Sequence, residues 1–221
     1  MTQVQTETAE ERLVHVQAGI ATLTGDLVVP EGASGVVLFA HGSGSSRLSP
    51  RNRAVGRRLS DRGLATLLID LLTPEEERVD IETAHLRFDI GLLADRLAGA
   101  KDWLAEQPAT RDLRIGYFGA STGAAAALHP KSIGAVVSRG GRPDLAGNLL
   151  PRVQAPTLLI VGGEDLAVIE MNRDAFAQLT CRKKLEIVPG ATHLFEEPGA
   201  LETVGRLAGD WLVEHLAPPK R

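Results

Sequence analysis

The chain contains one cysteine, Cys181, among its 221 residues. One thiol cannot form a disulfide within the chain, and it excludes a cysteine-rich zinc site. No apolar run approaches the roughly 20 residues that a membrane-spanning helix needs. Residues 1–10 are polar and lack the hydrophobic segment of a secretion signal. We therefore expect a cytoplasmic protein in which residues 1–10 are frayed or disordered.

The chain also has no excess of basic residues, since 24 Lys and Arg stand against 28 Asp and Glu. The formal net charge of -4 and the scattered basic residues argue against binding to nucleic acid or to an anionic membrane. A content of 43% hydrophobic and 24% charged residues is typical of a globular domain. We expect residues 11–217 to form one domain, as a monomer or a homodimer.

Strand-like segments alternate with helix-like segments along the whole chain. This alternation predicts an α/β fold with a mostly parallel sheet covered by helices on both faces. We expect a hairpin at residues 12–17 and 21–29, and further strands at 36–40, 65–71, 114–118, 133–138, 156–162 and 184–188. We expect helices at 52–62, 81–106, 124–128, 145–150, 170–179 and 199–216, and a loop at 73–80.

The most informative motif is Gly119-Ala120-Ser121-Thr122-Gly123, which joins a short strand to an alanine run. A strand that turns at once into a helix holds the central serine in a strained conformation, and a Cβ at either glycine would collide with a neighbouring element. This layout is typical of a nucleophile elbow. It makes Ser121 the candidate catalytic nucleophile.

A serine nucleophile needs a histidine base, and that histidine needs a carboxylate to orient it. In the elbow fold the order is serine, acid, histidine. His129 lies at the far end of the helix after Ser121, and His215 lies inside the predicted last helix. His193 remains as the candidate base. It lies in a loop directly after the last strand, where open α/β sheets place their functional residues.

The acid is expected between Ser121 and His193, at the carboxyl end of a strand. Asp165 fits, because the apolar strand at 156–162 is followed by Gly163, Glu164 and Asp165. Glu164 is the rival acid. An aspartate in this place can also cap the following helix, and the two roles are compatible.

Acyl transfer also needs donors for the developing oxyanion. The loop His41-Gly42-Ser43-Gly44-Ser45-Ser46 follows the strand at 36–40, so we expect the amides of Ser43 and Thr122 to form the oxyanion hole. A phosphate-binding loop is the alternative, although the P-loop lysine and the dinucleotide spacing are missing. We expect His41 to support this loop by hydrogen bonds rather than to act as a base.

Two arginines could select an acidic substrate. Arg139 and Arg142 follow the strand at 133–138, so they lie at the same edge of the sheet as Ser121. A guanidinium binds a carboxylate through two hydrogen bonds. The alternative is that these arginines pair with Asp144 or Glu164. The connection between the strands at 133–138 and 156–162 is short, which predicts an open site without a large lid, suited to small soluble esters.

With these motifs in order, the chain resembles the α/β-hydrolase superfamily and, within it, the dienelactone hydrolase-like group. The resemblance covers nearly the whole chain, from Val14 to Leu216. It implies an eight-stranded sheet, a Ser121–Asp165–His193 triad, and hydrolysis of a carboxylic ester, lactone or similar acyl bond without a cofactor or metal. Dienelactone hydrolases are known for a cysteine nucleophile, whereas this chain has Ser121. The helix after Ser121 also looks short, with Pro130 expected to end it.

Four alternatives to an ester hydrolase stay open at this point. A thioesterase, a peptidase or an acyltransferase would use the same triad, because the chemistry before deacylation is shared. The fourth alternative is a binding or regulatory module that has the fold but no useful turnover, since a fold alone does not establish an activity.

Overall fold

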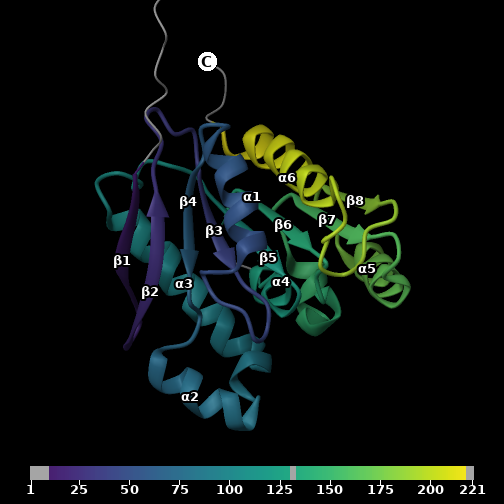
Figure 1. The fold of residues 1–221 in the computed structure, drawn as a ribbon, viewed down its shortest axis with the longest axis horizontal. Coiled ribbons are helices and arrows are strands. Elements are labelled where there is room, and N and C mark those ends of the chain that lie inside the picture. Colours follow the sequence, from purple (N-terminus) through teal and green to yellow (C-terminus); the bar gives the residue numbers. More distant parts are fainter. Residues whose placement is uncertain (1–9, 130–132, 218–221) are drawn as a thin grey trace, which may run out of the picture.

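The computed structural model describes residues 10–129 and 133–217, and in this part of the chain eight strands form one sheet. The strand order is β1-β2-β4-β3-β5-β6-β7-β8 (Figure 1). β2 is antiparallel to both of its neighbours, β1 and β4, and all other neighbouring pairs are parallel. The predicted mostly parallel, eight-stranded sheet is confirmed.

The strands are β1 Glu11–Ala18, β2 Ala21–Val28, β3 Val36–Ala40, β4 Ala65–Ile69, β5 Ile115–Ala120, β6 Ala135–Arg139, β7 Thr157–Gly162 and β8 Lys183–Val188. The helices are α1 Pro50–Ser60, α2 Pro74–Thr83, α3 Ile90–Glu106, α4 Thr122–Ala127, α5 Leu166–Gln178 and α6 Ala200–Leu216, with 3-10 segments η1 Leu86–Phe88 and η2 Pro143–Arg152. Every predicted strand is present, with its ends shifted by no more than about two residues.

Helices cover both faces of the sheet, as predicted. α1 and α6 pack together on one face, while α3, α4 and α5 lie on the other (Figure 1). The strands β3, β4, β6 and β7 are buried at every position, as expected for parallel strands enclosed between two helical layers. The carboxyl ends of the parallel strands therefore meet at one edge of the sheet, where the candidate site residues lie.

The predicted loop at residues 73–80 is wrong, because the helix α2 begins at Pro74. Thr73 and Glu76 form a reciprocal capping box, and Pro74 stands at the first helical position, where its missing N–H is tolerated. The predicted single helix at 81–106 is also wrong. Ala84 adopts a left-handed conformation with φ of 55°, so α2 ends there and α3 starts only at Ile90.

Three smaller differences concern helices around the site. α5 begins at Leu166, four residues before the predicted start at residue 170. The predicted helix at 145–150 is the 3-10 segment η2, interrupted at Gly147, which has φ of 53°. α4 ends at Ala127 and is short, as expected, while Pro130 lies outside the described residues.

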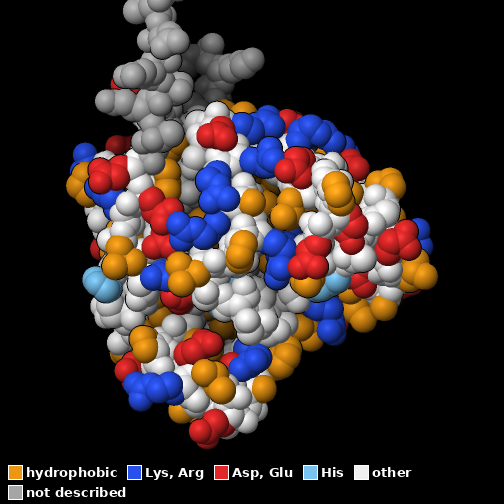
Figure 2. All heavy atoms as spheres, viewed as in Figure 1, with side chains coloured by type: hydrophobic (Ala, Val, Ile, Leu, Met, Phe, Trp, Pro, Cys, Tyr) orange, Lys and Arg blue, Asp and Glu red, His pale blue; other side chains and the backbone are white. Residues whose placement is uncertain are grey.

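The face of the molecule viewed in Figure 2 shows no broad area of one charge. In Figure 2, Lys and Arg side chains alternate with Asp and Glu side chains over the viewed face. This mixed surface agrees with the scattered charges of the sequence. Within residues 10–129 and 133–217, no helix is long and apolar enough to span a bilayer.

Candidate active site

Ser121 stands at the sharp turn between β5 and α4. It has φ of 50° and ψ of -122°, a conformation that is strained for any residue other than glycine. A Cβ at Gly119 would lie 2.4 Å from the Cα of Ala124, and a Cβ at Gly123 would lie 2.3 Å from the carbonyl oxygen of Ala40. The two glycines therefore permit the tight turn for the reason that the sequence suggested.

His193 and Asp165 form a hydrogen-bonded pair. The distance between His193 Nδ1 and Asp165 Oδ2 is 2.6 Å, and the Asp165 side chain is 17% exposed. Asp165 stands at the start of α5, but its side chain does not cap this helix, so its carboxylate is free for His193. Glu164, the rival acid, is exposed.

The His193 ring lies beside the backbone that adjoins Ser121. The amide of Ser121 donates to the carbonyl of Arg139, and a Cβ at the next residue, Gly140, would lie 3.6 Å from His193 Cε1. Phe195 is fully buried with φ of 57°, and this buried, left-handed residue anchors the loop that carries His193. Of the described residues, Ser121 and His193 share no hydrogen bond. Such bonds are often long in unliganded enzymes.

The loop between β3 and α1 lies against the elbow. A Cβ at Gly42 would approach Ser121 Cβ to 2.9 Å. The amide of Ser43 donates to the side-chain oxygen of Thr122 at 2.9 Å. The two predicted oxyanion donors are thus neighbours, but the Ser43 amide already has an acceptor. The Thr122 amide is the first of α4, and the first amides of a helix have no acceptor within it.

His41 holds the start of this loop. Its Nε2 accepts a hydrogen bond from the amide of Leu71 at 3.1 Å, so the proton is on Nδ1, which donates to the carbonyl of Gly42 at 2.9 Å. Burial lowers the pKa of His41, although its hydrogen bond to Gly42 acts in the opposite direction. His41 is a neutral support of the loop, as expected.

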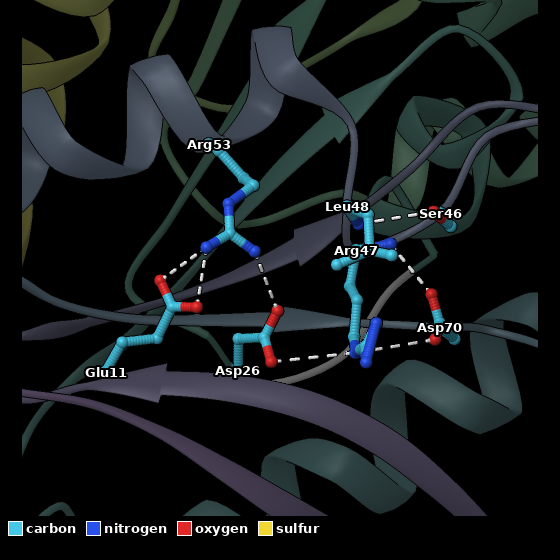
Figure 3. Close-up of polar contacts among 7 residues, drawn as sticks. All are labelled: Glu11, Asp26, Ser46, Arg47, Leu48, Arg53 and Asp70. Carbon is cyan, nitrogen blue, oxygen red and sulfur yellow. Dashed lines mark hydrogen bonds and ion pairs between the residues drawn. The ribbon is translucent and has the colours of Figure 1, made fainter.

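A chain of ion pairs fixes the rest of the loop to the sheet (Figure 3). Arg47 donates its backbone amide to Asp70, 2.7 Å away, and its guanidinium lies between Asp70 and Asp26. Asp26 also accepts from Arg53 of α1, which pairs with Glu11 of β1. The segment that carries Ser43 is therefore tied through Arg47 to β2 and to the residue that follows β4, and through Asp26 and Arg53 to α1 and β1. The sequence did not indicate this network.

The two candidate arginines differ sharply. Arg142 forms two hydrogen bonds to Asp144, at 2.9 and 2.7 Å. This is the pairing that the sequence offered as the alternative to substrate binding. Arg139 is only 7% exposed, and its Nε and Nη1 have no hydrogen-bond partner among the described residues, although its guanidinium lies 5.9 Å from the ring centre of Phe195. Its Nη2 approaches Asn52 Oδ1 at 3.5 Å. Burial, together with the nearby charge of Arg51, lowers the pKa of Arg139 to about 10.

A narrow cleft opens beside the loop that carries Ser43. Its lining includes residues 41–45, Thr122 and, from the segment of α2 and η1, Glu77, Asp80 and Arg87. The sequence pattern did not single out these last three residues, because it predicts a loop and a long helix for their segment. The capping box at Thr73 was the signal that could have placed α2. Within residues 10–129 and 133–217, the cleft included, no three His, Cys, Asp or Glu side chains gather as a metal site would require.

Comparison with known proteins decides the family. The sequence profile of the dienelactone hydrolase family matches residues 23–206. The chain belongs to the dienelactone hydrolase family. A dienelactone hydrolase from Anabaena variabilis is 61% identical, with a TM-score of 0.93 over 95% of this chain and all of that one. An esterase from Pyrococcus furiosus has the same fold, with a TM-score of 0.75 and 19% identity over 95% of this chain and 94% of that one.

Two curated relatives are longer than this chain. A protein from two strains of Mycobacterium tuberculosis, described as a candidate phosphoribosyl transferase, is 58% identical over 211 residues. The match covers 93% of this chain but 47% of that protein. The chain therefore spans about half the length of these curated relatives.

Proposed function

We propose that this protein is a serine hydrolase that cleaves the acyl bond of a small ester or lactone through an acyl-enzyme. The observation that carries the proposal is the 2.6 Å bond between His193 and Asp165, beside the strained turn at Ser121. A strained serine, an oriented histidine and a buried helix start together are typical of acyl transfer. Membership of the dienelactone hydrolase family supports the same chemistry.

The geometry supports the following assignment of protons in the proposed mechanism. Asp165 accepts a hydrogen bond from His193 Nδ1–H, so Nε2 is left as the base. His193 Nε2 takes the hydroxyl proton of Ser121 as the serine oxygen attacks the acyl carbon, and the carbonyl electron pair moves onto its oxygen. The Thr122 amide stabilises this oxyanion. His193 then protonates the leaving alcohol, and a water that it deprotonates releases the acid.

The test compares hydrolysis of p-nitrophenyl acetate and butyrate by the wild type and by Ser121→Ala, with covalent labelling by a fluorophosphonate. The wild type should turn over and label. Ser121→Ala should do neither, with a loss on the order of 10⁶ in turnover if the triad acts as a unit. Ser60→Ala, which changes a serine at the end of α1, is the matched control and should behave as the wild type. Activity retained by Ser121→Ala would contradict the proposal.

We further propose that the preferred substrate carries a negative charge. Arg139 lies at the end of β6, and the residue that follows it contacts His193, so its guanidinium is near the reacting groups. The charge of Arg51 acts on Arg139, and Arg51 Nε is also buried without a hydrogen-bond partner among the described residues, although Arg51 Nη1 pairs with Glu196. Buried charges are normally paired, and an acidic substrate would supply the missing partner. Arg142 is the weaker candidate for this role, because its guanidinium already pairs with Asp144.

The transferase name of the mycobacterial relatives suggests a different reaction. The family match covers this chain, whereas more than half of each relative lies outside it. We propose that the transferase name applies to the part of those proteins that this chain does not match, and that the matched part is a hydrolase.

A further inference from the structure

The contact between Ser43 and Thr122 joins the two parts of the candidate oxyanion hole. The Ser43 amide donates to Thr122 Oγ1 at 2.9 Å, across 79 residues of sequence. Thr122 is only 3% exposed. The Ser43 amide therefore acts on the hydroxyl of Thr122 and not directly on a substrate in this arrangement.

This hydrogen bond leaves the hydroxyl proton of Thr122 without an acceptor in the described part of the chain. Because Oγ1 accepts from Ser43, its proton must point elsewhere. Within residues 10–129 and 133–217, this hydroxyl donates to no acceptor. A buried donor that lacks an acceptor destabilises the folded state, so native proteins seldom keep one without a function.

The position of Thr122 allows a substrate oxygen to accept this proton. Thr122 and Ser43 both line the narrow cleft, and Thr122 follows the candidate nucleophile directly. Gly42 packs against Ser121 on the other side of the turn. The carbonyl oxygen of an acyl group attacked by Ser121 would therefore lie next to both the amide and the hydroxyl of Thr122.

We propose that the Thr122 hydroxyl is a catalytic donor to the oxyanion, polarised by the Ser43 amide. This inference rests on the proposed serine hydrolase function. The oxyanion then receives two hydrogen bonds from one residue, through the Thr122 amide and the Thr122 hydroxyl. No proton is transferred in this contact, since the serine proton goes to His193. Hydrogen bonds in such a chain strengthen one another, so the Ser43 amide increases the donor strength of the hydroxyl.

The test replaces the hydroxyl while keeping the shape of the side chain. Thr122→Val should lower kcat for p-nitrophenyl acetate by about 10²-fold to 10³-fold, the usual effect of losing one oxyanion donor, with little change in KM. Thr122→Ser keeps the hydroxyl and should stay within about tenfold of the wild type. Thr110→Val is the matched control, because Thr110 is a buried threonine whose hydroxyl donates to the carbonyl of Leu104 outside the site.

A second measurement separates catalysis from structure. A trifluoromethyl ketone forms a tetrahedral adduct with a serine and so resembles the oxyanion intermediate. Its affinity for Thr122→Val should fall by the same factor as kcat/KM. The affinity for a product acid should not change. If valine prevents folding, Thr122→Ala, which cannot crowd the turn, carries the same expectation.

The outcomes distinguish this inference from the proposed function. Full or increased activity of Thr122→Val, beside an inactive Ser121→Ala, would overturn the inference alone and would mean that the hydroxyl merely occupies the Ser43 amide. A wild type that neither hydrolyses esters nor labels with a fluorophosphonate would overturn the serine hydrolase function, and the role of Thr122 with it.

Discussion

Arg139 is a buried charge that no acidic side chain balances among the described residues. Burial lowers its pKa to about 10, so keeping it charged at pH 7 costs folding free energy. Arg139→Met should therefore raise the free energy of unfolding at pH 7 by about 1–3 kcal/mol. The gain should shrink above pH 10, because there the wild-type Arg139 loses its proton in the folded state. Urea unfolding at the two pH values measures both effects.

The same variant tests the acidic substrate. The measured quantity is kcat/KM for a p-nitrophenyl ester with a terminal carboxylate, divided by kcat/KM for a neutral ester of equal length. Arg139→Met should lower this ratio by about 10-fold to 100-fold, which is the usual contribution of a charge-assisted hydrogen bond. Arg142→Met is the matched control and should leave the ratio unchanged. An unchanged ratio in Arg139→Met would remove the proposed anion site.

Ser121, Asp165 and His193 could be grouped from the sequence for a physical reason. Each of them follows a strand, and parallel strands deliver their ends to one edge of the sheet. The choice between Arg139 and Arg142 could not be made in this way. It depends on which side chain finds a local carboxylate, and Asp144 lies within reach of Arg142 alone.

At the scale of elements, the segment of α2 and η1 forms one wall of the cleft. Asp80 holds it together by accepting from the amides of Leu86 and Arg87 and from Arg87 Nε at 2.5 Å. Burial would raise the pKa of Asp80, but the hydrogen bonds from Arg87 outweigh this and lower it. The stabilisation is therefore complete above the unfolded pKa of about 4 and is lost as the pH falls through the folded value.

Asp80→Asn should loosen this wall without unfolding the protein. We expect amide exchange in residues 74–89 to accelerate about 5-fold to 150-fold, which corresponds to about 1–3 kcal/mol for a lost buried hydrogen bond. Exchange in α6 should not change. Hydrogen exchange with mass spectrometry measures both, and Glu75→Gln, which removes an exposed charge of the same helix, is the control. Equal exchange in Asp80→Asn and the control would contradict this role for Asp80.

At the scale of the whole molecule, the sequence indicated the layers but not the contacts that join them. Alternating segments predict a sheet between two helical layers, because each apolar strand must be covered on both faces. The pairing of Arg53 with Glu11 and Asp26 spans 42 and 27 residues, and no local pattern in the sequence encodes it. Such pairs depend on the final packing of α1 over the antiparallel edge of the sheet (Figure 3).

This long-range ion pair leads to a prediction about global stability. Asp26 is 7% exposed, and burial raises its pKa although Arg47 and Arg53 act against this. Arg53→Met leaves Asp26 charged with one partner fewer, so the free energy of unfolding at pH 7 should fall by about 1–3 kcal/mol. The loss should shrink at pH 4.5, because the raised pKa lets Asp26 take up a proton in the folded state.

A double-mutant cycle with urea unfolding provides the measurement. Asp26→Asn combined with Arg53→Met should recover at least half of the loss, since no buried charge is then left with a missing partner. Arg78→Met breaks an exposed pair with Glu75 and should change stability by less than about 1 kcal/mol. If Arg53→Met behaves like Arg78→Met at both pH values, the pair is a surface contact. In that case, the antiparallel hairpin is held to the molecule by its apolar face and its backbone hydrogen bonds to β4.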